Sequence, residues 1–331
     1  MSDYVNGVLL VGTGKMAIEY AKVLKSLCVP LIVVGRSEKS CSNFMEKTGM
    51  MAISGGVERV LNSYQPFRYA IVAVNVEQLG NVTIKLLNNG VPNILVEKPG
   101  GLMEELPQLA ELAKKKRANV YVAYNRRFLS TVRKARQLIE ADGGLISLTF
   151  QFTEKSDLIE KTNHAQRVKE QWLLANSSHV IDLAFYFGGR PVKFTSFVQG
   201  RGKLSWHPEA SVFCGSGVTE NKVLFSYHAN WEAPGSWEVH LYTKNYHLLL
   251  QPLEQLKVQK HGAKEIKRVP LHDVYDRRFK PGLFLQVLSF LSEKGKDLKT
   301  IVEQCEDVRN IYKIIAMNGD EEGERCSGRR S

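Results

Sequence analysis

The sequence predicts an α/β protein: a doubly wound parallel sheet, followed by an α+β part with a large open mixed or antiparallel sheet. Three observations lead to this prediction. A continuous apolar run near the start ends in a Gly-x-Gly turn, and an amphipathic segment follows directly. Strand-like and helix-like segments then alternate to about residue 123, as in parallel sheets covered on both faces. After residue 190, several strand-like runs follow one another with turns between them.

The first strand, turn and helix have the pattern of a dinucleotide-binding Rossmann unit. Residues 8–11 are apolar, and the turn reads Gly12, Thr13, Gly14, Lys15, Met16, with Ala17 in place of a third glycine. Glycines allow the backbone to turn sharply and to approach a pyrophosphate at the positive end of the next helix. A Gly-x-Gly turn also occurs as a plain connection, so the prediction depends on the strand and helix around it.

The other elements of the first domain, residues 1–124, follow in order. Strands are predicted at residues 31–34, 51–53 (a weak signal), 69–74, 93–96 and 120–124, and helices at 37–45, 76–89 and 102–116. Ser37 is a suitable helix cap, and Gly49 and Gly90 end helices. Because crossovers between parallel strands are right-handed, these elements form one doubly wound sheet with a cofactor crevice at the carboxyl ends of its strands.

The second domain is expected over residues 125–317 and serves substrate binding and oligomerisation. Helices are predicted at residues 128–141, 178–187, 283–292 and 301–317, and strands at 146–153, 193–198, 211–214, 222–229, 236–243, 246–251 and 255–260. Residues 155–170 are polar and irregular, which indicates a loop near the site. Residues 318–331 are charged and poor in apolar side chains, so we expect a disordered tail.

Composition excludes several classes of function. The chain has 331 residues, 44% hydrophobic and 24% charged, which is typical of a soluble globular protein. Its five cysteines are scattered without metal-ligand spacing, so we expect reduced thiols, a cytoplasmic location and no metal site. The net charge of +11 comes from dispersed bases mixed with acids, which favours an anionic cofactor or substrate over nucleic acid. No apolar run is long enough to span a membrane.

The end of the second strand indicates which cofactor binds. An NAD site usually has a carboxylate here that accepts hydrogen bonds from the ribose hydroxyls. This chain has Arg36 and Ser37 instead, which suit a 2′-phosphate and therefore NADP, although NAD is possible. A solvated loop arginine is the plainer interpretation, and Glu38 could still accept from a ribose.

Glu97, Lys98 and Pro99 lie at the carboxyl end of the fifth predicted strand. A lysine there can lie beside a nicotinamide, donate to a substrate oxygen and stabilise a developing alkoxide. The alternative is a lysine in solvent at a strand end.

With these motifs, the sequence resembles the Gfo/Idh/MocA family of NAD(P)-dependent sugar oxidoreductases over residues 6–317. The resemblance rests on four motifs: the glycine turn, Glu97-Lys98-Pro99, Tyr124-Asn125-Arg126-Arg127-Phe128, and His179-Val180-Ile181-Asp182. It implies a Rossmann domain and an α/β domain whose open sheet mediates oligomerisation. By position, Lys98 matches the lysine that contacts the nicotinamide and the reacting hydroxyl, and His179 matches the general acid/base. A histidine suits proton transfer because its ordinary pKa is near 6.5.

Two departures from the family pattern stand out. Ala175 replaces the aspartate that many members carry four residues before the histidine, and Val74-Asn75 replaces the usual Thr-Pro. Cofactor binding is expected to survive both changes, whereas the proton relay and the direction of the reaction are open. Asn176 or a substrate group could take over the role of the aspartate.

The predicted site has three parts. The catalytic residues are Lys98 and His179. The cofactor-binding residues are Gly12, Thr13, Gly14, Lys15, Met16, Arg36, Ser37, Asn75, Glu97 and Lys98. The substrate-binding residues are Tyr124, Asn125, Arg126, Trp172, Asn176 and Asp182, although a tryptophan such as Trp172 is as often part of a core.

We therefore expect an NADP-preferring oxidoreductase that moves hydride between the nicotinamide and a carbinol or ketone carbon of a sugar or sugar-derived acid. An NAD(P)-binding regulator or scaffold without catalysis is the main alternative, and Ala175 favours it. Reduction of a non-sugar carbonyl or imine is a third. Because an open sheet with exposed Phe, Trp, Tyr and Leu would be an apolar patch, we expect a homodimer or a tetramer.

Overall fold

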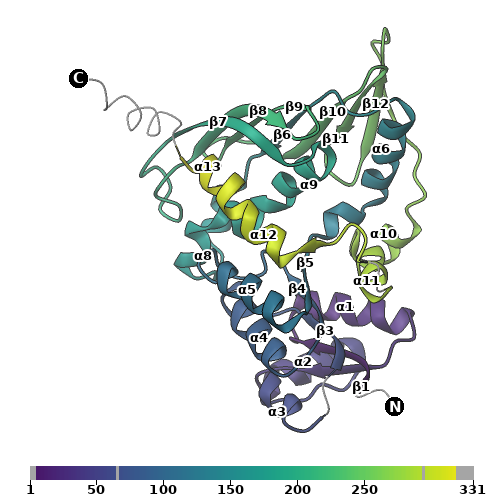
Figure 1. Ribbon diagram of the computed structural model, residues 1–331, viewed down its shortest axis with the longest axis vertical. Helices are drawn as coiled ribbons and strands as arrows, with labels where there is room; N and C mark the ends of the chain where they lie inside the picture. Colours follow the sequence, from purple (N-terminus) through teal and green to yellow (C-terminus); the bar gives the residue numbers. More distant parts are fainter. Residues whose placement is uncertain (1–4, 65–66, 293–294, 318–331) are drawn as a thin grey trace. The chain divides into compact units, whose positions relative to one another are not determined.

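The computed structural model describes residues 5–64, 67–292 and 295–317 (Figure 1). The chain forms two compact units, the first from residues 1–128 and 273–306 and the second from residues 129–272 and 307–331. Residues 273–306, predicted from the sequence to lie in the second domain, pack with the first unit. The tail predicted at 318–331 lies outside the described residues.

The first unit contains the predicted parallel sheet, in the order β14-β5-β4-β3-β1-β2. Its parallel strands are β1 (Val5–Val11), β2 (Leu31–Val34), β3 (Phe67–Val72), β4 (Asn93–Glu97) and β5 (Asn119–Ala123). The short strand β14 (Lys299–Thr300) comes from the returning segment and pairs antiparallel with β5. The weak strand predicted at 51–53 is reduced to one bridge between Ile53 and Val34.

Helices cover this sheet as the alternating pattern predicts. They are α1 (Lys15–Ser26), α2 (Glu38–Thr48), α3 (Val57–Leu61), α4 (Val76–Asn88) and α5 (Leu106–Lys116), followed after β5 by the 3₁₀ turn η1 (Asn125–Phe128). The returning segment adds α10 (Val274–Arg278), α11 (Leu283–Leu291) and most of α12 (Ile301–Asp307). Helix α11 is mostly apolar and packs on α1. Together with α1 and the strands, it closes one hydrophobic core.

The second unit is built on an eight-stranded sheet in the order β13-β12-β11-β10-β6-β9-β8-β7. The strands are β6 (Ser147–Phe152), β7 (Pro191–Gln199), β8 (Val212–Thr219), β9 (Leu224–Asn230), β10 (Trp237–Tyr242), β11 (Tyr246–Leu250), β12 (Leu256–Lys260) and β13 (Ile266–Arg268). Strands β6 and β9 pair in parallel and the other neighbours antiparallel, so of the two predicted alternatives, mixed or antiparallel, the sheet is mixed.

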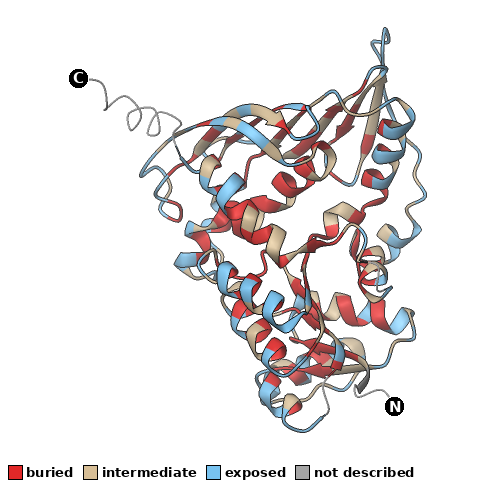
Figure 2. Cartoon of the chain, viewed as in Figure 1, coloured by how far each residue is buried: buried red, intermediate tan, exposed pale blue. Residues whose placement is uncertain are grey.

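The second unit also contains helices, some of which pack on this sheet. They are α6 (Ser130–Ala141), α7 (Ser156–Glu160), α8 (Gln166–Glu170), the π-helical turn η2 (Leu173–Ser177), α9 (Ser178–Gly188), a second π turn η3 (Val308–Tyr312) and α13 (Lys313–Ile315). Helix α9 contacts β6 and β10, and α13 contacts β7 and β8. Figure 2 shows that α9 is largely buried. The segment expected to be irregular at 155–170 contains two short helices.

The other face of the sheet is more polar than expected. Because strand side chains alternate, Leu148, Phe150 and Phe152 of β6 are buried on the helix side, while Ser147, Thr149 and Gln151 lie on the opposite side. From the sequence we expect Phe, Trp, Tyr and Leu on this open face. In the structure Trp231 is buried, and the middle of the open face carries hydroxyl groups.

Candidate functional site

The glycine turn after β1 has the shape that a dinucleotide requires. Gly12 has φ +123°, and a Cβ there would overlap the backbone carbonyl of Ala73. Gly14 lies at the N-cap of α1, and a Cβ added to it would meet nothing within 4 Å. Ala17 is fully buried against the core. The turn therefore leaves an open backbone surface at a helix N-terminus, which fits a pyrophosphate.

The end of β2 lies next to this turn. Gly35 has no room for a side chain, because a Cβ there would contact Cys41 and Thr13. Arg36 is exposed, with its guanidinium available to solvent. Ser37 caps α2, since its hydroxyl accepts a hydrogen bond from the Ser40 amide at 3.3 Å. Contact of either residue with a 2′-phosphate stays a prediction.

Asn75 is the N-cap residue of α4, at the carboxyl end of β3. Its side chain makes no capping hydrogen bond and is exposed. The predicted cofactor residues therefore lie at the carboxyl ends of β1, β2, β3 and β4. Parallel strands place these ends at one edge of the sheet.

Glu97 and Lys98 end β4 beside a buried tyrosine from α1. The hydroxyl of Tyr20 donates to Glu97 Oε1 at 2.6 Å, and the Tyr20 side chain is fully buried. Burial raises the pKa of Tyr20 well above its ordinary value, and the negative charge of Glu97 raises it further. Burial also raises the pKa of Glu97, while the bond from Tyr20 and the charges of Lys98 and Lys280 act in the opposite direction.

The segment after Lys98 is held by the returning chain. The Lys98–Pro99 peptide bond is cis, and the amide of Gln304 on α12 donates to the Pro99 carbonyl at 3.1 Å. The same amide donates to the Tyr124 hydroxyl at 2.9 Å. The ammonium group of Lys299 lies 5.5 Å from the centre of the Tyr124 ring.

The three substrate residues predicted after β5 have different environments. Tyr124 and Asn125 are buried, and Asn125 donates to the Pro281 carbonyl at 2.8 Å. Arg126 is partly exposed. These contacts assign a packing role to Tyr124 and Asn125, and they leave a role in substrate binding as a prediction.

In the second unit, His179 lies in the first turn of α9. Its ring is partly buried, and its centre is 5.9 Å from that of Trp237. Asn176 and Ser177, just before α9, both bond to the buried carboxylate of Glu154. Asp182 is buried one turn after His179.

Trp172 belongs to an aromatic cluster. Its ring packs edge-on against Trp206 at 5.9 Å and against His164 at 5.6 Å, and Trp206 stacks on Trp231. This arrangement favours the core interpretation of Trp172 over stacking on a sugar.

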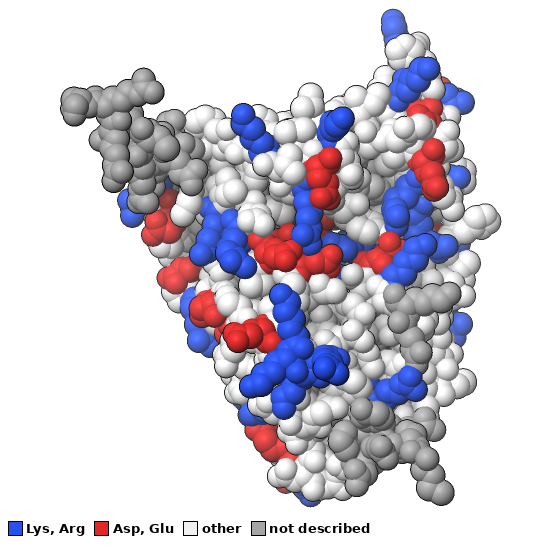
Figure 3. Space-filling view, in the orientation of Figure 1, with Lys and Arg blue, Asp and Glu red and all other residues white. Residues whose placement is uncertain are grey.

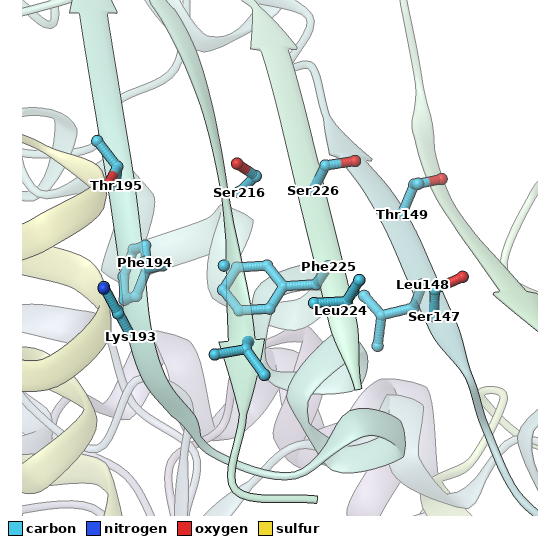
Figure 4. Close-up of a pocket in the computed structure, with 12 residues that line it drawn as sticks. Ser147, Leu148, Thr149, Lys193, Phe194, Thr195, Ser216, Leu224, Phe225 and Ser226 are labelled. Atoms are coloured by element: carbon cyan, nitrogen blue, oxygen red, sulfur yellow. The ribbon is translucent and has the colours of Figure 1, made fainter. Parts of the chain in front are cut away.

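Two pockets lie in the second unit. One has a volume of about 290 Å³ beside the end of β6 and includes Glu154, Trp237, Thr153 and Lys155 in its wall. The other has about 550 Å³ and lies along β6, β7, β8 and β9 (Figure 4). Of these two, the first shares residues with the surroundings of His179.

Other expectations concern metals, thiols and charge. Within the described ranges, no group of three or more metal-ligating side chains is found. In the same ranges, no helix is long and apolar enough to cross a membrane. Four cysteines are free thiols. On the face shown in Figure 3, lysines and arginines are interspersed with aspartates and glutamates.

Sequence reasoning missed Tyr20, Glu154 and Gln304. In the sequence, Tyr20 and Gln304 have the pattern of ordinary helix residues. Their hydrogen-bond partners lie far away in the chain, so no local pattern indicates these bonds. Glu154 gave a weak signal, as an acidic residue directly after a strand of alternating apolar residues.

A protein-family comparison matches residues 6–124 to GFO_IDH_MocA, described as an oxidoreductase family with an NAD-binding Rossmann fold. A search of curated proteins finds no match.

Solved structures share the fold of nearly the whole chain. A dehydrogenase from Chromobacterium violaceum has a TM-score of 0.73 and 20% identity, with 97% of each chain covered. Levoglucosan dehydrogenase in complex with NADH and levoglucosan has a TM-score of 0.74 and 16% identity, covering 95% of this chain and 97% of that one. UDP-N-acetylglucosamine 3-dehydrogenase GnnA from Acidithiobacillus ferrooxidans has a TM-score of 0.71 and 12% identity, with the same coverage. Residues 6–124 therefore match the Gfo/Idh/MocA oxidoreductase family, in agreement with the motifs of that segment, and the chain as a whole shares the fold of these solved structures.

Proposed function

We propose that this protein is an NADP-preferring oxidoreductase that moves hydride between the nicotinamide and a carbinol or ketone carbon of a sugar or sugar-derived acid. The observation that carries the proposal is the anchoring of Lys98. It follows Glu97, which is bonded to Tyr20 of α1, and it precedes Pro99, which is bonded to Gln304. A lysine that was simply exposed to solvent at a strand end would not require hydrogen bonds that hold the residues before and after it.

Each residue has a defined task in this proposal. When bound, the nicotinamide supplies or accepts the hydride. Lys98 donates a hydrogen bond to the substrate oxygen and stabilises the negative charge that develops there. His179 gives a proton to that oxygen during reduction and takes it back during oxidation.

Preference for NADP is supported by the end of β2. Arg36 is exposed there, and no carboxylate stands at the position that usually accepts from the ribose. Glu38 is the first residue of α2, where a carboxylate also interacts favourably with the helix dipole.

A sugar-like substrate is supported by what similar folds bind. Levoglucosan dehydrogenase and GnnA act on carbohydrates by their names, although their low identities leave the substrate of this chain as part of the proposal. The net charge of +11 favours an anionic sugar derivative.

We also propose that the protein is cytoplasmic and that the open face of the β6–β13 sheet joins two copies into a homodimer or a tetramer. Thr195, Ser216, Ser226 and Thr149 lie in register across four neighbouring strands of this face (Figure 4). Exposed Phe197 and Leu224 flank this hydroxyl row, so the face combines apolar area with hydrogen-bonding groups, as interfaces do.

Single-turnover oxidation of bound NADPH, with the best substrate from a sugar and keto-acid panel, tests the catalytic roles. Lys98→Met removes the charge at similar length and is expected to slow turnover by about a hundredfold while NADPH binding is kept. His179→Ala is expected to slow it by about a hundredfold as well and to flatten its pH profile near neutrality.

Turnover equal to the parent in both variants would show that the two residues are structural. Tight NADPH binding without turnover of any candidate would favour the regulator, which the missing carboxylate at Ala175 already suggests.

A further inference from the structure

Glu154 binds the turn of helix that immediately precedes His179. Its side chain is buried, with 8% of its surface exposed. Glu154 Oε1 accepts from Ser177 Oγ at 2.7 Å, and both carboxylate oxygens accept from Asn176 Nδ2 at 3.1 Å. One carboxylate thus receives hydrogen bonds from two consecutive side chains.

Two consecutive anchors fix the rotation of a helical turn. Consecutive side chains leave a helical turn in different directions, so a group that binds both restrains the rotation of that turn. Asn176 and Ser177 belong to the π turn η2, whose hydrogen-bond pattern differs from that of the α-helix it precedes. Such turns occur often at functional sites. His179 follows two residues after Ser177, so its direction depends on this turn.

Glu154 also supplies a carboxylate where the helix lacks one. Residue 175, adjacent to Asn176, is a buried alanine. Another acidic residue of the same sheet, Glu238, lies on the open face beside His240. The carboxylate that bonds to the η2 turn is therefore that of Glu154, which follows β6 in the chain and does not belong to η2 or α9.

We propose that Glu154 is a positioning residue for the proton-transfer site: through Asn176 and Ser177 it sets the orientation of His179. The proposal rests on the proposed function, because it assigns His179 the proton transfer. Glu154 also lines the 290 Å³ pocket together with Trp237, whose ring centre lies 5.9 Å from that of His179.

A donor–acceptor exchange tests the proposal. Glu154→Gln keeps one accepting oxygen but places an NH₂ group, in place of the second oxygen, against Asn176 Nδ2, and Asn176→Asp puts two carboxylates together. In the double variant E154Q/N176D, the amide introduced at position 154 can donate to the carboxylate introduced at position 176, while its oxygen still accepts from Ser177. We expect each single variant to lower kcat about tenfold, with the KM for NADPH unchanged, and the double variant to recover within about threefold of the parent. Glu265→Gln, an exposed glutamate in the same unit, is the control.

A readout without turnover separates this proposal from the proposed function. NMR of ¹³C-labelled histidines, with the His179 signal identified by its loss in His179→Asn, reports the surroundings of the ring directly. The signal is expected to shift in E154Q and in Ser177→Ala and to return in the double variant. An unmoved His179 signal in folded E154Q, or a double variant as impaired as the singles, would overturn the role of Glu154. A parent without turnover would count against the proposed function alone.

Discussion

Single residues around Lys98 show how contacts between distant parts of the chain build the site. Tyr20 and Glu97 are 77 residues apart, and Gln304 and Pro99 are 205 apart. The Tyr20 side chain and the Gln304 amide are buried, so losing one partner leaves a buried polar group unsatisfied. The residues on both sides of Lys98 are therefore held by side chains of α1 and α12 that do not belong to any catalytic motif.

Arg36 is predicted to select the cofactor. Arg36→Ala should weaken NADPH binding by about 1–3 kcal/mol, because a charge-assisted bond to the 2′-phosphate is lost, and should change NADH binding little. Fluorescence titration of both cofactors measures the difference, with Lys39→Ala as an exposed cationic control on α2. Equal losses for NADPH and NADH would mean that Arg36 stacks on the adenine.

At the scale of elements, the two glycines of the β1–α1 turn differ in whether the fold itself requires them. Gly12 is required by the backbone, because its φ of +123° and the neighbouring Ala73 carbonyl exclude a side chain. Gly14 has φ −79° and open space around its Cβ direction, so nothing in the protein itself requires glycine there.

The two glycines should therefore respond differently to alanine. Gly14→Ala is expected to leave the thermal unfolding temperature of the free protein nearly unchanged and to weaken NADPH binding at least tenfold, because its methyl group occupies the cofactor's space. Gly12→Ala should destabilise the fold by about 1–3 kcal/mol or more. NADPH binding at parental strength in Gly14→Ala would argue against a pyrophosphate on this turn.

The loop between β7 and β8 contains a buried histidine that links stability to pH. His207 packs on Trp231 with ring centres 4.9 Å apart, and its Nδ1 lies 2.8 Å from the Ala210 carbonyl. Burial lowers the pKa of His207 from its ordinary value of 6.5. The unfolded chain then binds a proton more readily than the folded one, so the free energy of unfolding falls as the pH falls below 6.5.

Denaturant unfolding between pH 7.5 and pH 5 measures this dependence. The contribution of His207 should be fully present above pH 6.5 and should decrease below it by at most about 1.4 kcal/mol for each pH unit. His207→Gln, which cannot take up a proton, should have a shallower slope over the same range. An unchanged slope in this variant would assign the dependence to other groups, such as His247, whose pKa burial also lowers.

At the scale of the whole molecule, assembly depends on the open face of the second sheet. The hydroxyl row at its centre continues to His240, which pairs with Thr149 and lies 3.0 Å from His247 between ring nitrogens. This polar row is flanked by apolar side chains, so the face is suited to a specific contact rather than to nonspecific aggregation.

Light scattering at micromolar concentration tests the proposed assembly. The parent is expected to have at least twice the mass of one 37.3 kDa chain. Ser226→Arg introduces a bulky charge in the middle of the hydroxyl row and should shift the protein to monomers, whereas Glu140→Arg on the exposed side of α6 should not. A monomeric parent would contradict the proposal.

The sequence by itself determined the order of the elements, the glycine turn and the class of the fold. These features depend on local periodicity and on backbone conformations that only glycine adopts readily, so neighbouring residues suffice to reveal them. The same local signals predicted the strands of the second sheet, but not that β6 and β9 pair in parallel, because a pattern of alternation carries no direction.

Only the tertiary structure decided which residues hold the site. The segment after residue 272 returns to the Rossmann unit and supplies Gln304 and Lys299, and Glu154 brings a carboxylate to the turn in which Ala175 replaces the usual acid. The bond from Gln304 to the buried Tyr124 hydroxyl likewise became known only from the structure, and the role of Tyr124 in substrate binding stays a prediction. A hydrogen bond between residues far apart in the chain does not change the hydrophobic periodicity of either segment, so it can be identified only from the folded structure.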